Sequence, residues 1–118
     1  TPEFRAYIRR VVENSRAMAA EFTRMGYEVV TGGTDNHMFL LDFTRTHRAI
    51  TGQMVQQALD SRAITLNKNS VPGETRSPMQ TSGVRIGTAA MTTKGFGRDD
   101  FIAVAHRIDE IITSLTRE

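Results

Sequence analysis

Hydrophobic side chains recur every three or four residues along the beginning of the chain. The recurring positions, one of which is a serine, are Phe4, Ile8, Val11, Ser15, Met18, Phe22 and Met25. This spacing places them on one face of an α-helix. Thr1 can cap the helix, Pro2 suits its first turn because proline lacks an N–H, and Gly26 is expected to end it. A helix of this extent would be roughly 35 Å long, which suggests that it reaches along a neighbouring domain.

The same spacing predicts two further helices. A final helix begins near Arg98 and carries Asp99 and Asp100 in its first turn, where carboxylates are favoured by the helix dipole. Its hydrophobic stripe consists of Phe101, Ala105, Ile108, Ile112 and Leu115. A shorter helix, capped by Thr51, carries Met54, Val55, Ala58 and Leu59.

Four short apolar segments have the composition of β-strands. They are residues 27–30, 38–43, 64–66 and 84–88. The polar sequence TGGTDNH between the first two predicts the turn of a hairpin. Residues 67–83 contain two prolines, two glycines and many short polar side chains, so they predict a long irregular loop, and TTKGFG predicts a second loop. Strands interspersed with packed helices indicate an α+β sandwich.

Composition and charge narrow the classes of protein that the chain can represent. Its 118 residues fit one domain, and its apolar runs are too short to cross a bilayer. The net charge is +2, with basic residues scattered among acidic ones, so we expect no nucleic-acid partner. Cysteine is absent, which excludes disulfides and thiolate metal sites and is compatible with a reducing cytosol. Because the chain begins directly at a helix start without Met, we interpret it as a fragment of a longer protein.

Arg85 is the strongest candidate for a binding residue. In the segment SGVRIGT, strand alternation points Val84 and Ile86 to one face and Arg85 to the other. A guanidinium on a rigid strand offers a fixed fork for two parallel bonds to a carboxylate or phosphate, and the neighbouring Gly83 and Gly87 would let a ligand approach. The alternative is an ordinary surface ion pair between Arg85 and an acidic side chain.

Other polar residues give weaker signals. Asn69 could offer an amide donor and acceptor to a heteroaromatic ring, although a turn explains NKNSVPG equally well. Lys68 and Lys94, the only lysines, both fall in predicted polar loops, where a solvated amine is expected. Asp35 and His37 can bond to each other or to the backbone. The other histidines are far away in sequence, so we predict no metal site.

Four sequence segments together resemble one protein family. They are GYEVVTGGTDNHMFLLDF, ITGQMVQQAL, ITLNKNSVP and SPMQTSGVRIGTAAMTTKGF, and they cover nearly the whole chain. In this order and spacing they resemble serine hydroxymethyltransferase. The resemblance implies that residues 1–118 form a single C-terminal domain of a type I, aspartate-aminotransferase-like pyridoxal phosphate enzyme. In that fold the small domain is an α/β sandwich with a mostly antiparallel sheet, and the complete enzyme is a homodimer.

The resemblance also implies an activity and site residues. The family uses pyridoxal phosphate to interconvert serine plus tetrahydrofolate with glycine plus 5,10-methylenetetrahydrofolate, here expected in the cytoplasm. Arg85 matches the arginine that holds the substrate carboxylate. The folate contacts of the family match Asn69, Ser77, Pro78 and Met79. The sequence departs from the usual family pattern in having Met79 in place of Phe, Ala89 in place of Pro and Lys94 in place of Arg.

The catalytic residues of the family belong to its preceding large domain. The lysine that binds the cofactor, the phosphate site and the acid catalyst are all implied to lie outside these 118 residues. We therefore expect no catalytic residue in this chain, an inactive isolated fragment and an active complete protein. The alternatives are a stand-alone amino-acid-binding module in which Arg85 anchors a carboxylate without catalysis, and a purely structural dimerisation segment.

Overall fold

Residues 1–32, 35–59 and 65–116 are described by the computed structural model, and within them four antiparallel strands form one sheet. The strand order is β1-β2-β4-β3, so β4 lies between β2 and β3. The strands are β1 Glu28–Gly32, β2 Asp35–Asp42, β3 Thr65–Asn69 and β4 Gly83–Gly87. The predicted α+β class with a mostly antiparallel sheet is confirmed.

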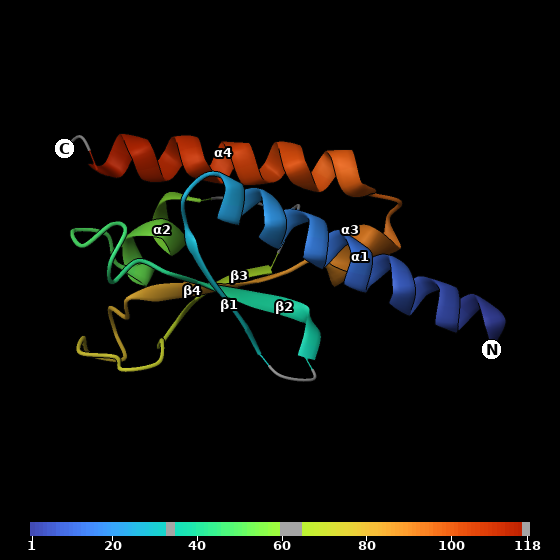
Figure 1. The fold of residues 1–118 in the computed structure, drawn as a ribbon, viewed down its shortest axis with the longest axis horizontal. Coiled ribbons are helices and arrows are strands. Elements are labelled where there is room, and N and C mark those ends of the chain that lie inside the picture. The colour runs from blue at the N-terminus through green and yellow to red at the C-terminus, as the bar shows by residue number, and fades with distance from the viewer. Residues whose placement is uncertain (33–34, 60–64, 117–118) are drawn as a thin grey trace.

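The helices pack on one side of this sheet (Figure 1). α1 lies against β1 and β2, α2 lies against β3 and β4, and α4 packs across α1 and α2. Their bounds are α1 Pro2–Arg24, α2 Gly52–Ala58, α3 Ala89–Thr93 and α4 Arg98–Thr116. The three helices predicted from hydrophobic spacing are therefore confirmed, and α3 is an addition.

Alternation along the strands separates a buried face from a more accessible one. The side chains toward the helices are fully or almost fully buried and include Phe39, Leu41, Val84 and Ile86. They meet Met18 and Phe22 of α1 and the apolar stripe of α4 in one core. On the opposite face, which we call the open face, lie Val30, Leu40, Asn67 and Arg85, none of which is buried.

The ends of α1 follow the sequence signals. The hydroxyl of Thr1 accepts a hydrogen bond from the backbone N–H of Phe4 at 3.1 Å. Gly26 adopts a φ of +95°, a left-handed conformation that glycine reaches without strain, so the chain turns away from the helix there. The first turns of α1 extend beyond the sheet (Figure 1), and the side chain of Phe4 is 60% exposed. The predicted start and end of this helix are confirmed.

Some predicted loops are shorter than expected. The strand ladder continues to Gly32 and Asp35, so most of TGGTDNH is strand instead of turn. β3 continues to Asn69, whereas the prediction placed residues 67–69 in a loop. Pairing with β4 holds residues 67–69 extended despite their polar composition. In the other segment Thr31 pairs with Phe39 and Gly32 with Asp35, with a shift of register between Thr31 and Gly32. Residues 33–34 and Ile64, and the side chains of Asp35 and His37, lie outside the described part of the structure.

The predicted TTKGFG loop was also partly wrong, because Thr92 and Thr93 belong to α3. The hydroxyl of Thr92 donates to the carbonyl of Thr88 at 2.9 Å. The side-chain amide of Asn14 on α1 donates to that hydroxyl at 3.0 Å and to the carbonyl of Phe96 at 3.2 Å. The buried side chain of Asn14 thus supplies hydrogen-bond donors to two acceptors of this segment and stabilises its helical turn.

A charged cluster joins the end of α1 to α4. The carboxylate of Glu21 accepts hydrogen bonds from Arg24 and from the ring nitrogen Nε2 of His106. Nearby, the hydroxyl of Tyr27 donates to Asp109 of α4 at 2.7 Å. The hydrogen bond from Arg24, followed by that from His106, outweighs the effect of burial and lowers the pKa of Glu21 from 4.5 to about 2.

This cluster predicts a loss of stability in acid. Because the pKa of Glu21 is lowered in the folded state, its stabilising contribution is present above the ordinary pKa of 4.5 and is lost as pH falls toward about 2. Between about pH 6 and pH 3, the melting temperature should therefore fall more steeply for the wild-type protein than for Glu21→Gln. Glu13→Gln, an exposed change on the same helix, should follow the wild-type curve. Parallel curves for wild type and Glu21→Gln would contradict this role of Glu21.

Candidate functional site

Arg85 lies at the middle of β4, on the open face of the sheet. Its side chain is exposed, whereas Val84 and Ile86 on either side are fully buried. The register places Leu40 of β2 and Asn67 of β3 directly beside it. The predicted outward direction of Arg85 is confirmed. Pairing on both edges of β4 fixes the backbone from which the guanidinium projects.

The two glycines on the face of Arg85 do not have the same role. Gly83 and Gly87 are each two positions from Arg85 and therefore share its face. A Cβ on Gly83 would lie 2.5 Å from the carbonyl oxygen of Leu41 and 2.5 Å from a methyl group of Val71. Close packing, not ligand access, therefore requires glycine at position 83, and the expectation that both glycines leave room for a ligand was wrong for Gly83.

The surface ion pair considered for Arg85 does not form with any described residue. Ion pairs between described residues involve the carboxylates of Glu21, Glu28 and Glu110. Their cationic partners are Arg24, His106, Arg45 and Arg107. In the described part of the chain the guanidinium of Arg85 is thus not engaged by a carboxylate, which leaves its fork available for an anionic ligand.

Asn69 lies on the same face as Arg85. It pairs with Gly83 at the end of β3, and its side-chain amide donates to the carbonyl of Ser70 at 2.8 Å. Asn67, two positions earlier, lies directly opposite Arg85 and is exposed. Directly opposed side chains have Cβ atoms about 5 Å apart, whereas diagonal ones are about 7 to 8 Å apart. Sequence reasoning missed Asn67, which strand alternation in LNKN would have placed with Asn69.

Ser77, Pro78 and Met79 belong to a hydrogen-bonded turn before β4. The carbonyl of Ser77 accepts from the backbone N–H groups of Gln80 and Thr81 at 3.0 and 2.9 Å. The carbonyl of Met79 accepts from the amine of Lys68 at 2.9 Å, while the Met79 side chain is 66% exposed. The backbone of this segment is therefore fixed, and an apolar side chain faces outward from it.

Neither lysine is a buried amine. The amino group of Lys68 is held by the Met79 carbonyl, and Lys94 is exposed in the turn after α3. A lysine that reacts as a neutral amine usually requires desolvation or a neighbouring cation. The expected solvated amine in a polar loop is confirmed for Lys94, whereas Lys68 belongs to β3 and its amine is hydrogen-bonded.

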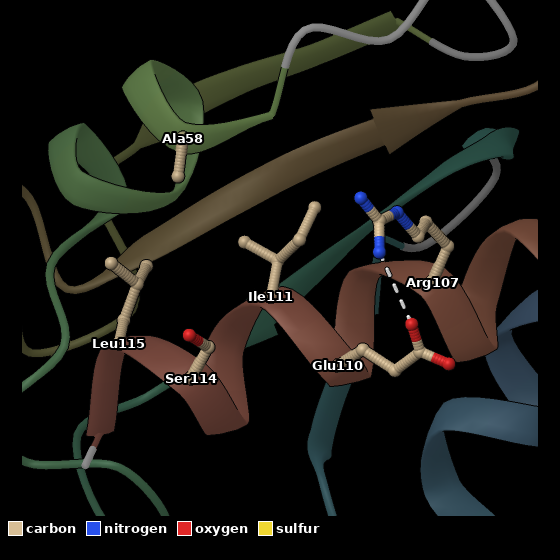
Figure 2. Close-up of a pocket in the computed structure, with 6 residues that line it drawn as sticks. All are labelled: Ala58, Arg107, Glu110, Ile111, Ser114 and Leu115. Carbon is tan, nitrogen blue, oxygen red and sulfur yellow. Dashed lines mark hydrogen bonds and ion pairs between the residues drawn. The ribbon is translucent and has the colours of Figure 1, made fainter.

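Arg85 does not line either of two pockets in the described structure, although the first includes Val30 of the open face. One, of about 350 Å³, is lined by residues of β1, β2 and the loop after β3, including Glu28, Asp42 and Gly73. The other, of about 230 Å³, lies between α2 and α4 and is shown in Figure 2. Its rim carries the ion pair between Arg107 and Glu110, at 3.2 Å. The second pocket is on the helical side of the sheet and does not contribute to the surface around Arg85.

Within residues 1–32, 35–59 and 65–116, no group of three or more His, Cys, Asp or Glu side chains is arranged to hold a metal ion. No helix in these ranges is both long enough and apolar enough to cross a membrane.

Comparison with known proteins identifies close sequence relatives. The family model described as serine hydroxymethyltransferase matches residues 1–108. Proteins named serine hydroxymethyltransferase are 45% identical in Rickettsia typhi, 42% in Rickettsia akari and 45% in Rickettsia prowazekii, each over 114 residues. Each alignment covers 97% of this chain and 27% of the relative. The chain thus spans about a quarter of the length of the curated relatives that it matches.

Proposed function

This chain belongs to the serine hydroxymethyltransferase family, and we propose that residues 1–118 form the small C-terminal domain of a complete pyridoxal phosphate-dependent enzyme. That enzyme interconverts serine plus tetrahydrofolate with glycine plus 5,10-methylenetetrahydrofolate. We further propose that it is a cytoplasmic homodimer whose partners include neither nucleic acid nor a membrane. Family membership supports the activity, and the surroundings of Arg85 support the role of this domain.

The proposed role of Arg85 is to bind the carboxylate of serine or glycine. The observation that carries this proposal is an exposed guanidinium on a central strand, with no described carboxylate paired to it. A guanidinium binds a carboxylate through two parallel hydrogen bonds, which fix both position and orientation. Asn67 directly opposite is well placed to complete a polar surface beside the bound carboxylate.

Orientation is the contribution of this domain to the reaction. When bound, pyridoxal phosphate supplies a conjugated ring that accepts electrons from the bond broken at the substrate Cα. That bond reacts only if it stands perpendicular to the ring, so the carboxylate must be held at a fixed angle. Arg85 on β4 can hold it because both edges of the strand are paired. The domain therefore orients the substrate, and groups in the rest of the complete protein carry out the bond-breaking step.

The described residues of this chain do not fit the cofactor itself. The Lys68 amine donates a hydrogen bond to the Met79 carbonyl, and Lys94 is exposed. Neither provides the desolvated amine that a covalent bond to the cofactor requires. We therefore assign cofactor binding and catalysis to the rest of the complete protein and expect the isolated 118-residue chain to be inactive.

The folate co-substrate is assigned to the segment before β4 and to the end of β3. Met79 offers an exposed apolar side chain on a fixed backbone, which suits packing against an aromatic ring system. Asn69 retains a side-chain carbonyl acceptor while its amide donates to Ser70. Ser77 and Pro78 define the turn that presents Met79.

The proposed function is tested by comparing the complete protein with the 118-residue chain. With pyridoxal phosphate, serine and tetrahydrofolate, the complete protein should form glycine at a rate that depends on both substrates, and the short chain should form none. Absence of that activity in the complete protein would overturn the proposal. Glycine binding by the short chain in titration calorimetry, combined with an inactive complete protein, would favour the stand-alone binding module.

A further inference from the structure

Residues 70–82 form a loop whose two ends are joined by one carboxylate. Oε1 of Glu74 accepts a hydrogen bond from the backbone N–H of Ser82 at 2.6 Å, and Oε2 accepts one from the Ser82 hydroxyl at 2.6 Å. Oε2 also accepts from the backbone N–H groups of Thr75 and Arg76 at 3.1 and 3.3 Å. Glu74 thus connects the beginning of the loop to the residue that directly precedes β4.

These contacts require an ionised carboxylate. Burial alone raises the pKa of Glu74, but the hydrogen bonds from the Ser82 hydroxyl and from the backbone N–H groups together lower it below the ordinary value of 4.5. At neutral pH the side chain is therefore an acceptor at both oxygens. Glutamine at this position would keep one acceptor oxygen and present an NH₂ group to the donors of Ser82.

Arg76 joins the same loop to the segment before α2. Its guanidinium donates to the carbonyls of Ile50, at 3.1 Å, and Arg48, at 2.5 Å. It also approaches the Ser82 hydroxyl at 3.4 Å. Ser82 is therefore the point at which the contacts of Glu74 and Arg76 meet.

The backbone between the turn and β4 is held at every carbonyl. The carbonyls of residues 79–82 accept, in order, from the amine of Lys68 and from the backbone N–H groups of Gln53, Gly52 and Phe43. Thr81 adopts a φ of 55°, which is unfavourable for a β-branched residue and persists only where its surroundings impose it. The conformation of this segment is therefore set by its contacts and not by local preference.

We propose that Glu74 is a positioning residue for the folate co-substrate: its bonds to Ser82 hold the Ser77–Met79 turn in one place beside β4. This inference rests on the proposed function and deepens it, because it adds a residue that does not itself touch the ligand. Arg85 does not depend on Glu74, since β2 and β3 hold β4 on both edges. Loss of the Glu74 contacts should thus affect folate binding selectively.

The test measures steady-state kinetics of the complete protein for both substrates. Glu74→Gln should raise KM for tetrahydrofolate about tenfold, the effect of losing a charge-assisted hydrogen bond, while kcat and KM for serine change by less than about twofold. Glu74→Asp should recover part of the folate affinity because it restores the charge. Glu110→Gln removes an exposed carboxylate that is paired with Arg107 on α4, so it serves as the matched control and should leave all three constants unchanged.

A second variant separates positioning from general destabilisation. Ser82→Ala removes the hydroxyl that donates to Glu74, together with its long 3.4 Å contact to Arg76. Its effect on KM for tetrahydrofolate should not add to that of Glu74→Gln in the double variant. Unchanged folate KM in both single variants, or equal rises in the KM values for serine and folate, would overturn the role of Glu74. If Glu74→Gln fails to fold, the KM values of Ser82→Ala alone test the proposal: an unchanged KM for folate, or equal rises for serine and folate, would overturn it. An inactive wild-type protein would instead refute the proposed function.

Discussion

Replacing Arg85 with lysine in the complete protein is expected to lower kcat/KM for serine by tens-fold or more. Lysine keeps the positive charge but cannot form two parallel hydrogen bonds to a carboxylate. Hydrogen bonds to charged groups each contribute about 1.5 to 3 kcal/mol, and loss of one corresponds to roughly 10- to 150-fold in kcat/KM. Loss of orientation adds to loss of binding, because a less constrained carboxylate spends less time in the reactive geometry.

The matched control for this experiment is Arg107→Lys. Arg107 is an exposed arginine on α4, on the helical side of the sheet, and its partner Glu110 can pair with lysine as well as with arginine (Figure 2). Serine kinetics should be unchanged in this variant. If Arg85→Lys also left serine kinetics unchanged while the wild-type protein was active, the assignment of Arg85 to the substrate carboxylate would be wrong.

Gly52→Ala is expected to destabilise the domain by about 2 kcal/mol. A Cβ at position 52 would lie 2.1 Å from the carbonyl oxygen of Gly83 and 2.3 Å from the hydroxyl oxygen of Thr81. Gly52 is the first residue of α2, so alanine gains there at most the roughly 0.5 to 1 kcal/mol that it gains over glycine in the middle of a helix. Overpacking against an immobile backbone costs about 3 kcal/mol, so the steric effect outweighs the helix preference. Relief of this overlap requires α2 to move away from the beginning of β4.

Urea unfolding of the wild-type protein and of two glycine variants tests this prediction. Gly97→Ala is the control, because a Cβ on Gly97 would meet no atom within 4 Å and its backbone needs no positive φ. Only Gly52→Ala should lower the free energy of unfolding of this domain. Equal stabilities of the two variants would show that α2 does not approach β4 as closely as described.

Predictions that depended on neighbouring residues in sequence were the most accurate. Helical spacing and the Thr1 cap gave the extent of α1, and strand alternation gave the direction of Arg85. Those features arise from backbone geometry over a few residues, so the sequence contains the necessary information. The polar residues 67–69 resembled a loop because their strand conformation is supported by pairing with β4, a contact that local composition does not reveal.

By itself, the sequence determined α1, α2 and α4, the α+β class, the family and the choice of Arg85 as an anion-binding candidate. Tertiary structure decided which side chains surround that arginine. Placing β4 between β2 and β3 brings Asn67 opposite Arg85, packs Val71 against Gly83 and aligns Glu74 with Ser82. Strand order and the pairing of buried backbone groups depend on contacts between residues far apart in the chain, whereas periodicity reports only on near neighbours. The exposed guanidinium was therefore predictable from local pattern, and the contacts that hold its strand and the preceding turn in place were not.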